Sequence, residues 1–394
     1  MQVGNVKNMK GVIKIIGCEG QYLFKFSIGD KDDFIKSDDL DYFTLIEEAG
    51  NILPTWEISF RTTDSDIQKV WHEGNDLKVS YGVFLEKLID VKLLITKKSI
   101  NRIGDEKLQV TAVGIYSEIC YITTPHVFIS DKKSGVEVAK DIVTKYFTWD
   151  KDNLAKSNES QYWIQPKTTD KKFVDELLIH SYLTNSFIGT GITSEGSFIV
   201  KDIRNAITSN PKGLYKFTLN VQKENDILYL GDHYLESNTG FINCWVGYGK
   251  EKPVYNLEND TYAKYLEQTE VLGILSDKFE RNSSVEKRSA TIGMENENTH
   301  PTYWKASLKN IQGLSLFSSE LLTLSYFNVL NSLKIFDVVM FKESDPKARK
   351  EQASKYESGL YITGLVSRSV SNNQFCTTVK LFREGHNAVI GNLR

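Results

Sequence analysis

Residues 359–384 read GLYITGLVSRSVSNNQFCTTVKLFRE, and this stretch decides the fold class. Side chains alternate between the two faces of a strand, so one face of a first strand would carry Tyr361, Thr363, Leu365 and Ser367. After a polar turn at Ser371, Asn372 and Asn373, one face of a second strand would carry Phe375, Thr377, Val379 and Leu381. This pattern predicts a β-hairpin and favours a protein built from sheets or barrels.

The bulk composition agrees with a packed, β-rich protein. The chain has 394 residues, which is enough for two or three domains of about 150 residues each. Aromatic residues make up 11% of the chain, and aromatic side chains fit the half-buried surface of a sheet. The formal net charge of −3 argues against a dedicated nucleic-acid binder.

Cysteine spacing and the lack of long apolar runs point to a reducing compartment. No two of the four cysteines form a CxxC pair, and each lies in or beside an apolar stretch, so we expect small core residues at Cys18, Cys120, Cys244 and Cys376. The first residues form no signal-peptide pattern, and no window reaches the ~18–20 apolar residues of a membrane span. We therefore expect synthesis in the cytosol and no membrane span.

The first part of the chain, to about residue 124, reads as successive strands. Alternation of apolar and polar residues predicts strands at 22–28, 56–61, 77–81, 91–96 and 108–116. Gly-containing turns such as the one at Gly74 separate them. This spacing favours an antiparallel barrel or sandwich.

Residues 125–204 change to a mixed pattern. Ser134 and Glu137 have the spacing of a capping box, in which each side chain bonds to the backbone amide of the other residue. A second helix is expected to begin at Thr169 or Asp170, and residues 197–204 return to strand. The pattern predicts a small α/β unit inserted between strands.

Strands resume at 215–222 and 241–248, followed by a polar region at 256–300 that includes an expected surface segment at 279–288. Pro301 then opens a helix, whose apolar face would carry Trp304, Leu308, Ile311 and Ser315. Strands at 321–330 and 338–341 and a charged loop at 342–357 lead into the terminal hairpin.

No motif for catalysis, metal binding or cofactor binding stands out. The histidines are His72, His126, His180, His233, His300 and His386, and none forms an HxH or HExxH pair. His180 reads as a packing or surface residue, and His233 is the most site-like of the six. Gly189 and Gly191 lack the third glycine of a dinucleotide-binding loop. We assign no catalytic, cofactor-binding or metal-binding residues and no cofactor.

Two alternatives stay open at this point. Scattered acids such as Asp232 and Glu236 leave room for a cell-wall hydrolase, because glycoside hydrolysis uses a pair of carboxyl groups. Aromatic residues on a β surface also suit a protein that binds a glycan or a receptor.

Three stretches together resemble the central hub of phage tail baseplates, which is related to the hub part of type VI secretion spike proteins. The first begins at Trp163-Ile-Gln-Pro166 and runs through His180-Ser-Tyr182 to Gly196-Ser-Phe198 and Asp202. The second is His300-Pro-Thr-Tyr-Trp304 with the helix and strand that follow it. The third is Ser358-Gly-Leu-Tyr-Ile-Thr-Gly364 with its return strand.

The resemblance implies a β-rich α+β fold with two antiparallel β-barrel domains and a small α/β insertion domain. Residues 1–124 plus 205–255 would form the first barrel, 125–204 the inserted α/β domain, and 256–394 a helix and a second barrel ending in the hairpin. A tail hub is a structural virion protein rather than an enzyme, and it would be assembled in the host cytoplasm and located in the tail baseplate.

The resemblance also implies a set of partners. Three chains would form a homotrimeric ring that adapts the hexameric tail tube to the trimeric, cell-puncturing spike. Tail tube proteins, the tape measure protein and other baseplate proteins would contact this ring, and DNA would only pass through its lumen during ejection. Three chains carry a formal charge of 3 × (−3) = −9, which repels phosphate.

Overall fold

The structure is a computed structural model of the whole chain. It describes residues 13–17, 20–28, 31–32, 35, 37–64, 66–82, 88–104, 106–152, 155–208, 214–219, 221, 225–237, 249–268, 293–296, 298–317, 320–327, 333–342, 357–371 and 374–384. The expected strand at 241–248 and the expected surface segment at 279–288 lie outside these residues.

The N-terminal part forms an antiparallel sheet in the order β1-β2-β6-β7-β8-β5-β4. Its members are β1 (Ile13–Gly17), β2 (Gly20–Ile28), β4 (Leu40–Glu48), β5 (Thr55–Thr62), β6 (Asp76–Gly82), β7 (Ile89–Ile103) and β8 (Lys107–Tyr116). Short elements flank it: β3 (Lys31–Asp32), the 3-10 helix η1 (Ser37–Asp39), α1 (Ile67–Val70) and α2 (Cys120–Thr123). The five strands predicted here from the sequence are confirmed.

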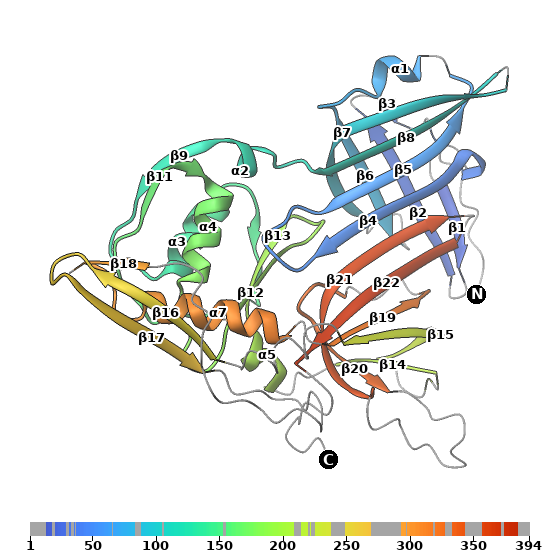
Figure 1. Cartoon of the computed structure of the whole chain (residues 1–394). Coiled ribbons are helices and arrows are strands. Elements are labelled where there is room, and N and C mark those ends of the chain that lie inside the picture. The colour runs from blue at the N-terminus through green and yellow to red at the C-terminus, as the bar shows by residue number, and fades with distance from the viewer. Residues whose placement is uncertain are drawn as a thin grey trace, which may run out of the picture.

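The C-terminal part contains a closed barrel of six strands. Its order is β21-β20-β14-β15-β19-β22, and β22 pairs again with β21. The strands are β14 (Tyr215–Thr218), β15 (Asp226–Ser237), β19 (Glu320–Tyr326), β20 (Val338–Lys342), β21 (Gly359–Ser371) and β22 (Gln374–Arg383). Figure 1 shows this barrel directly beside the N-terminal sheet.

The pairing of β14 and β15 differs from the expected division of the chain. The resemblance implies that residues 205–255 belong to the first barrel, but among the described residues β14 pairs with β15 and β20, and β15 pairs with β19. Both β14 neighbours run parallel to it. Strand partners depend on long-range contacts that alternation along one strand does not encode, so the sequence alone could not place these strands.

The terminal hairpin belongs to both β structures. Strand β21 pairs with β20 of the closed barrel and with β4 of the N-terminal sheet. We call the buried cluster around Phe24, Phe43, Phe60 and Leu93 the first core, and the cluster around Phe217, Leu324, Phe341 and Leu381 the second core. The hairpin gives Val366 and Val379 to the second core and Val370 and Phe375 to the first.

A bulge at Gly364 changes which residues of β21 face inward. The register against β22 shifts between Thr363 and Leu365. Tyr361 and Thr363 are buried as expected, but after the bulge Val366 is buried and Leu365 is half-exposed. The single face predicted for 361–367 is therefore wrong beyond Gly364, whereas the predicted face of β22 is buried throughout.

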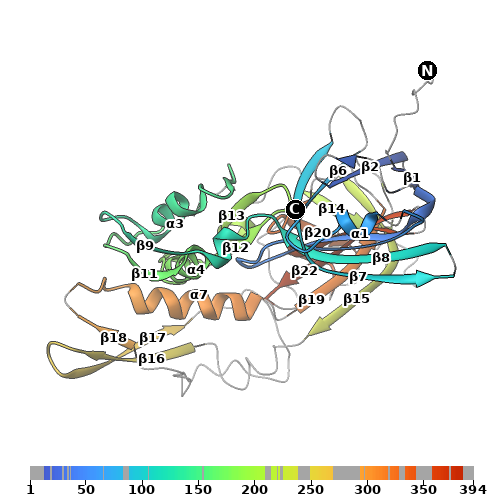
Figure 2. The same cartoon turned by 90° about the horizontal axis from the view of Figure 1, so that it is seen from above.

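Residues 125–208 form a smaller unit beside the sheets. It contains β9 (Pro125–Ile129), α3 (Gly135–Val143), β10 (Thr148–Trp149), β11 (Ile164–Thr169), α4 (Asp170–Ile179), β12 (Ile188–Ile192), β13 (Ser197–Asp202) and α5 (Ile203–Thr208). Strands β9 and β11 form a two-stranded ribbon, and β10-β13-β12 form a small sheet. Figure 2 shows the ribbon and its helices at the end of the molecule opposite the closed barrel.

The unit at 125–208 has no separate hydrophobic core among the described residues. Phe147 and Phe198 join the first core, while Phe187, Ile199 and Ile203 join the second. Aromatic contacts continue this packing, with the rings of Tyr116 and Phe147 5.9 Å apart. The unit is thus packed against both β structures.

Residues 249–317 contain a three-stranded sheet and a helix. The strands are β16 (Gly249–Asn256), β17 (Thr261–Gln268) and β18 (Gly293–Glu295), and the helix is α7 (Tyr303–Phe317). The polar region at 256–300 therefore contains two strands that the sequence did not reveal. The turn of the β16–β17 hairpin, at residues 257–260, is exposed, and apolar alternation along β17 is weak.

The inward face of α7 matches the prediction only in part: Leu308 is buried as expected, and the side chain of Ser315 lies outside the described ones. Ala306, Leu308 and Asn310 are buried, whereas Ile311 is 42% exposed. A Cβ atom on Gly313 would come within 2.3 Å of the Phe187 ring. Gly313 therefore lets α7 pack closely against Phe187. This contact helps to orient the helix, and apolar side chains at helical spacing do not predict it.

One prediction about cysteines is also wrong. Cys120, expected to be a core residue, is exposed, and Cys376 is half-buried. Cys18 and Cys244 lie outside the described residues.

Candidate functional site: the junction of the β structures and the exposed β surfaces

Three consecutive residues after β4 connect the major parts of the molecule. The amide of Ala49 donates to the carbonyl oxygen of Gly364 at 2.7 Å, and the amide of Gly50 donates to the carbonyl oxygen of Thr190 at 2.6 Å. The side-chain amide of Asn51 donates to Asp175 of α4 at 2.9 Å. This segment therefore contacts the hairpin, β12 and α4 in turn.

Gly50 is required at this position. Its φ of +125° is a conformation that residues with a Cβ atom rarely adopt. Any other residue would strain the backbone between β4 and β5, where the segment contacts β12 and α4. The glycine therefore fixes the path of the segment 49–51.

A buried ion pair lies next to this segment. Glu47 of β4 is 2% exposed, and its Oε1 atom lies 3.2 Å from Nη1 of Arg368 of β21. The backbone amide of Ser194 donates to Glu47 Oε1 at 2.8 Å, and Nη2 of Arg368 donates to the carbonyl oxygen of Leu333 at 2.9 Å. Four segments thus meet at one pair of charges.

The pKa of Arg368 reflects this pairing. Burial disfavours the charged guanidinium, but the negative charge of Glu47 favours it, and the net result is a raised pKa. Arg368 therefore stays charged at every physiological pH, and the pair is a permanent structural element.

The glycines at 189 and 191 also serve packing at this junction. Cβ atoms there would come within 2.6 Å of the Phe336 ring and 2.1 Å of the Ile335 side chain. Both partners belong to the second core. The two glycines therefore let β12 pack closely against the second core. This packing explains why glycine occupies both positions, and no nucleotide-binding role is needed to account for them.

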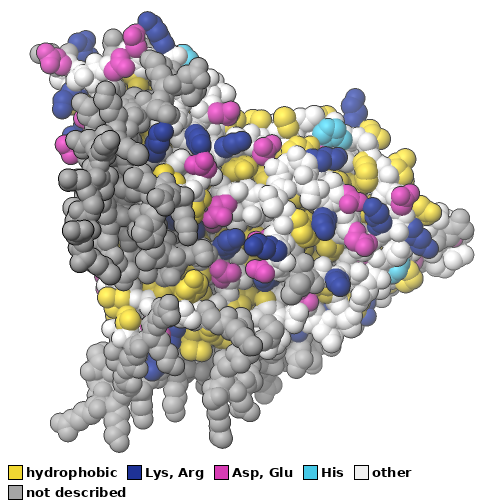
Figure 3. All heavy atoms as spheres, turned by 180° about the vertical axis from the view of Figure 1, so that it is seen from behind, with side chains coloured by type: hydrophobic (Ala, Val, Ile, Leu, Met, Phe, Trp, Pro, Cys, Tyr) yellow, Lys and Arg dark blue, Asp and Glu magenta, His cyan; other side chains and the backbone are white. Residues whose placement is uncertain are grey.

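The ribbon β9–β11 presents an apolar surface on its outer face. Its exposed fractions are 70% for Val127, 67% for Ile129, 68% for Tyr162 and 64% for Ile164. Ile129 and Ile164 are direct cross-strand neighbours. Figure 3 shows hydrophobic side chains among charged ones on this end of the molecule.

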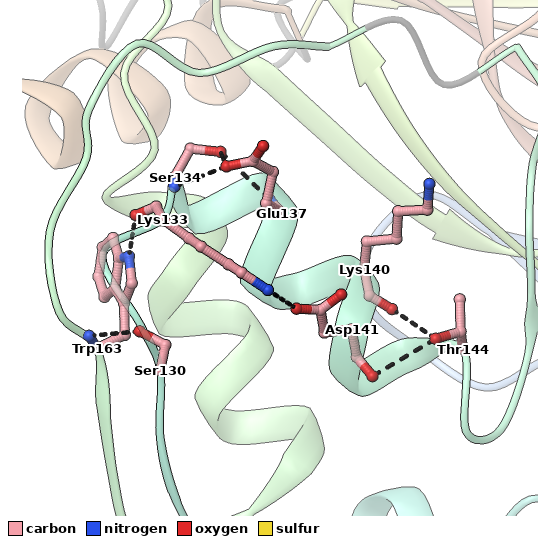
Figure 4. A network of polar contacts seen from close by, with 8 residues as sticks. All are labelled: Ser130, Lys133, Ser134, Glu137, Lys140, Asp141, Thr144 and Trp163. Carbon is pink, nitrogen blue, oxygen red and sulfur yellow. Dashed lines mark hydrogen bonds and ion pairs between the residues drawn. The ribbon is translucent and has the colours of Figure 1, made fainter.

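The inner side of this ribbon is held by polar contacts (Figure 4). The backbone amide of Trp163 donates to the Ser130 hydroxyl at 2.8 Å, and its indole N–H donates to the carbonyl oxygen of Lys133 at 3.2 Å. The predicted capping box of α3 is confirmed, with both reciprocal bonds between Ser134 and Glu137 present. These hydrogen bonds therefore support the ribbon that presents the apolar surface.

A second apolar surface lies on β15 of the closed barrel. Leu228, Leu230 and Tyr234 are 51%, 44% and 63% exposed. Ile227 and Tyr229, which alternate with the first two of these residues, belong to the second core. The alternation thus separates a barrel-filling face from an exposed apolar face on one strand.

Three of the histidines considered in the sequence analysis lie in three different environments. His180 stacks on Tyr303, His233 Nε2 lies 2.8 Å from Glu357, and His126 Nδ1 lies 3.2 Å from Asp170. Within the described part of the chain, no three His, Cys, Asp or Glu side chains are grouped to hold a metal ion. His386 lies outside that part.

The acids considered for hydrolysis do not form a buried pair. Asp232 is exposed and Glu236 is half-exposed on β15. The junction itself was missed by sequence reasoning. The sequence signal that could have revealed the junction is Glu47, because alternation along β4 places this carboxylate on the same face as Phe43 and Leu45.

Among the helices in the described part of the chain, none combines the length and the apolar character that crossing a membrane demands.

Comparison with known proteins identifies the fold. No protein-family model matches the chain, and no curated protein matches it. Solved structures do match: a tail protein from Neisseria meningitidis MC58 aligns over 93% of this chain and 98% of its own, with a TM-score of 0.59 and 8% identity.

A second match points the same way. The 43 kDa tail protein of prophage MuSo2 from Shewanella oneidensis aligns over 92% of this chain and 98% of its own, with a TM-score of 0.56 and 7% identity. The chain therefore has the fold of phage tail proteins over nearly its whole length, as the resemblance to baseplate hubs implies.

Proposed function

We propose that this protein is a structural component of a phage-type tail, namely the central hub of the baseplate. The observation that carries the proposal is the fold, which is shared with two tail proteins over more than nine-tenths of the chain. The described residues add a rigid junction and exposed apolar surfaces, which suit a protein that works by assembly.

In the proposed hub, three chains form a ring. The two β structures of each chain, joined by one hairpin, would supply six similar units around the axis, matching a hexameric tube on one side and a trimeric spike on the other. Obligate rings of this kind need subunit contacts of about 2,000 Å² or more. Such contacts must include apolar surface that a single chain leaves exposed.

We assign the subunit contact to the exposed face of β15. This face lies on the closed barrel, which must form part of the ring wall, whereas the β9–β11 ribbon lies at the opposite end of the molecule (Figure 1). The ribbon would then project to the periphery, where other baseplate proteins bind. The net charge of −3 per chain suits a lumen through which DNA slides without adhering.

The oligomeric state of the purified protein tests the proposal. We expect light scattering to give the mass of a trimer, and negative-stain images to show threefold rings. Addition of purified tube or spike protein from the same virion should yield a larger complex. A chain that stays monomeric at high concentration and binds neither partner would refute the hub.

A further inference from the structure

Strand β21 of the terminal hairpin carries Arg368, whose side chain is 14% exposed and pairs with the buried Glu47. Strand β21 pairs with β4 from Leu365 to Ser371, and Arg368 lies directly opposite Leu45. Glu47 lies opposite Val366, so Glu47 and Arg368 are diagonal neighbours across the two strands. A one-residue shift of β21 against β4 would turn Arg368 to the opposite face of the sheet and break the contact.

Glu47 is an anomaly on its strand. Leu45 and Phe43, two and four residues before it on the same face, are 0% and 2% exposed and belong to the first core. A carboxylate in such a row costs free energy unless it is paired and hydrogen-bonded. Arg368 and the Ser194 amide supply that pairing.

Arg368 lies between residues of both cores. On the same face of β21, Val366 two positions before it belongs to the second core, and Val370 two positions after it belongs to the first. Burial raises the pKa of Tyr81 and of Tyr326, and in each case the charge of Arg368 acts in the opposite direction. Tyr81 lies in the first core and Tyr326 in the second. A single guanidinium therefore interacts electrostatically with one buried phenol of each core.

We propose that the Glu47–Arg368 ion pair is a register lock that holds the terminal hairpin between the two cores, so that both cores loosen together when it is broken. Removing one partner leaves the other charge buried and uncompensated, which is strongly destabilising. Because that charge lies between both cores, the effect cannot stay within one of them. The lock is a property of the single chain and does not depend on the hub role.

The chain contains a matched control. Arg383 of β22 and Glu320 of β19 form a second buried ion pair, with Nε and Oε2 2.5 Å apart and exposed side-chain fractions of 3% and 1%. Both of its strands belong to the closed barrel. Breaking this pair removes a comparable buried interaction without touching the N-terminal sheet.

Hydrogen exchange of the full-length protein tests the lock. For Arg368→Met we expect at least tenfold faster amide exchange both in β5 of the N-terminal sheet and in β20 of the closed barrel. For Arg383→Met we expect acceleration in β19 and β22, with β5 within threefold of the wild type. Equal acceleration of β5 by the two substitutions would overturn the lock.

Glu47→Gln provides an independent measurement, because the side chain of Gln has nearly the same size and shape as that of Glu but carries no charge. The substitution removes the charge that pairs with Arg368, from a strand more than three hundred positions away in sequence. Faster amide exchange is nevertheless expected in β20 as well as in β5. Acceleration confined to β5 would overturn the proposal, even if Arg368→Met does not fold. Arg368→Lys keeps a positive charge and should give an intermediate acceleration in both strands.

Discussion

The imidazole ring of His180 lies flat on the phenol ring of Tyr303, with centroids 3.8 Å apart and planes 10° from parallel. His180 caps the C-terminal end of α4, and Tyr303 is the first residue of α7. Trp304 packs edge-on against both rings, and the ammonium group of Lys252 lies 4.0 Å from the Trp304 ring centroid. This stack joins α4, α7 and β16.

Stability should fall in acid because of His180. Burial lowers the pKa of His180 from 6.5 to about 4. The folded state thus binds the proton less well than the unfolded state. The contribution of His180 to the free energy of unfolding is therefore fully present above pH 6.5 and is lost as the pH falls toward 4. A shift of this size corresponds to at most about 3 kcal/mol.

Urea unfolding at pH 7.5 and at pH 4.5 measures this effect. The free energy of unfolding should drop more in the wild type than in His180→Phe, which keeps an aromatic stack but cannot be protonated. An identical drop in both proteins would show that other groups dominate the acid response.

Asn310 should be essential for the docking of α7. Its side-chain amide donates to the carbonyl oxygens of Leu178, Ile179 and Ser181 at 3.2, 2.9 and 3.0 Å, and its Oδ1 accepts from the Ile188 amide at 3.0 Å. Asn310→Leu leaves several buried polar groups unpaired, each at a cost of about 1–3 kcal/mol. We expect a loss of about 3 kcal/mol in urea unfolding.

The neighbouring Ile311→Gln is the control for Asn310. Ile311 is 42% exposed, so this change should alter the free energy of unfolding by less than about 0.5 kcal/mol. Similar losses from the two substitutions would contradict the structural role of Asn310.

Gly364→Ala should distort the bulge in β21. A Cβ atom at this position would lie 1.6 Å from a ring carbon of Phe382. The ring or the strand must move, and overpacking of this kind costs about 1–3 kcal/mol. Thermal unfolding of the single variant should show a clear drop in Tm.

A double-mutant cycle identifies the cause of that drop. Phe382→Leu removes the ring atoms that the added methyl group would meet, so the double variant should lose less than the sum of the two single losses. Additive losses would show that the clash with Phe382 is not what makes Gly364 necessary.

Tyr234→Glu should weaken assembly without unfolding the chain. Tyr234 is 63% exposed, so the substitution should change monomer stability by less than about 0.5 kcal/mol. A charge at the proposed subunit contact must be desolvated, which should shift the proposed trimer toward monomer in sedimentation velocity measurements.

Ile164→Glu on the ribbon is the matched substitution, because Ile164 is similarly exposed at 64%. We expect the proposed trimer to persist in this variant, since the ribbon lies at the end opposite the closed barrel. Dissociation by Ile164→Glu but not by Tyr234→Glu would move the subunit contact to the ribbon.

Local chemistry made part of the fold predictable. The capping box at Ser134 and Glu137 and the start of α4 after Thr169 depend on residues three positions apart, and both are confirmed. The buried face of β22 follows from strict alternation and is confirmed as well. In contrast, the close approach of α7 to Phe187 depends on Gly313, and no apolar periodicity along the helix predicts that contact.

The sequence by itself determined that this is a β-rich chain that ends in a hairpin, because alternation and turn residues act over a few positions. The tertiary structure decided that β14 and β15 complete the closed six-stranded barrel and that the hairpin contributes residues to two cores. It also decided that Glu47 meets Arg368. These outcomes depend on which distant strands pair, and that choice is set by the packing of the whole chain rather than by any one segment.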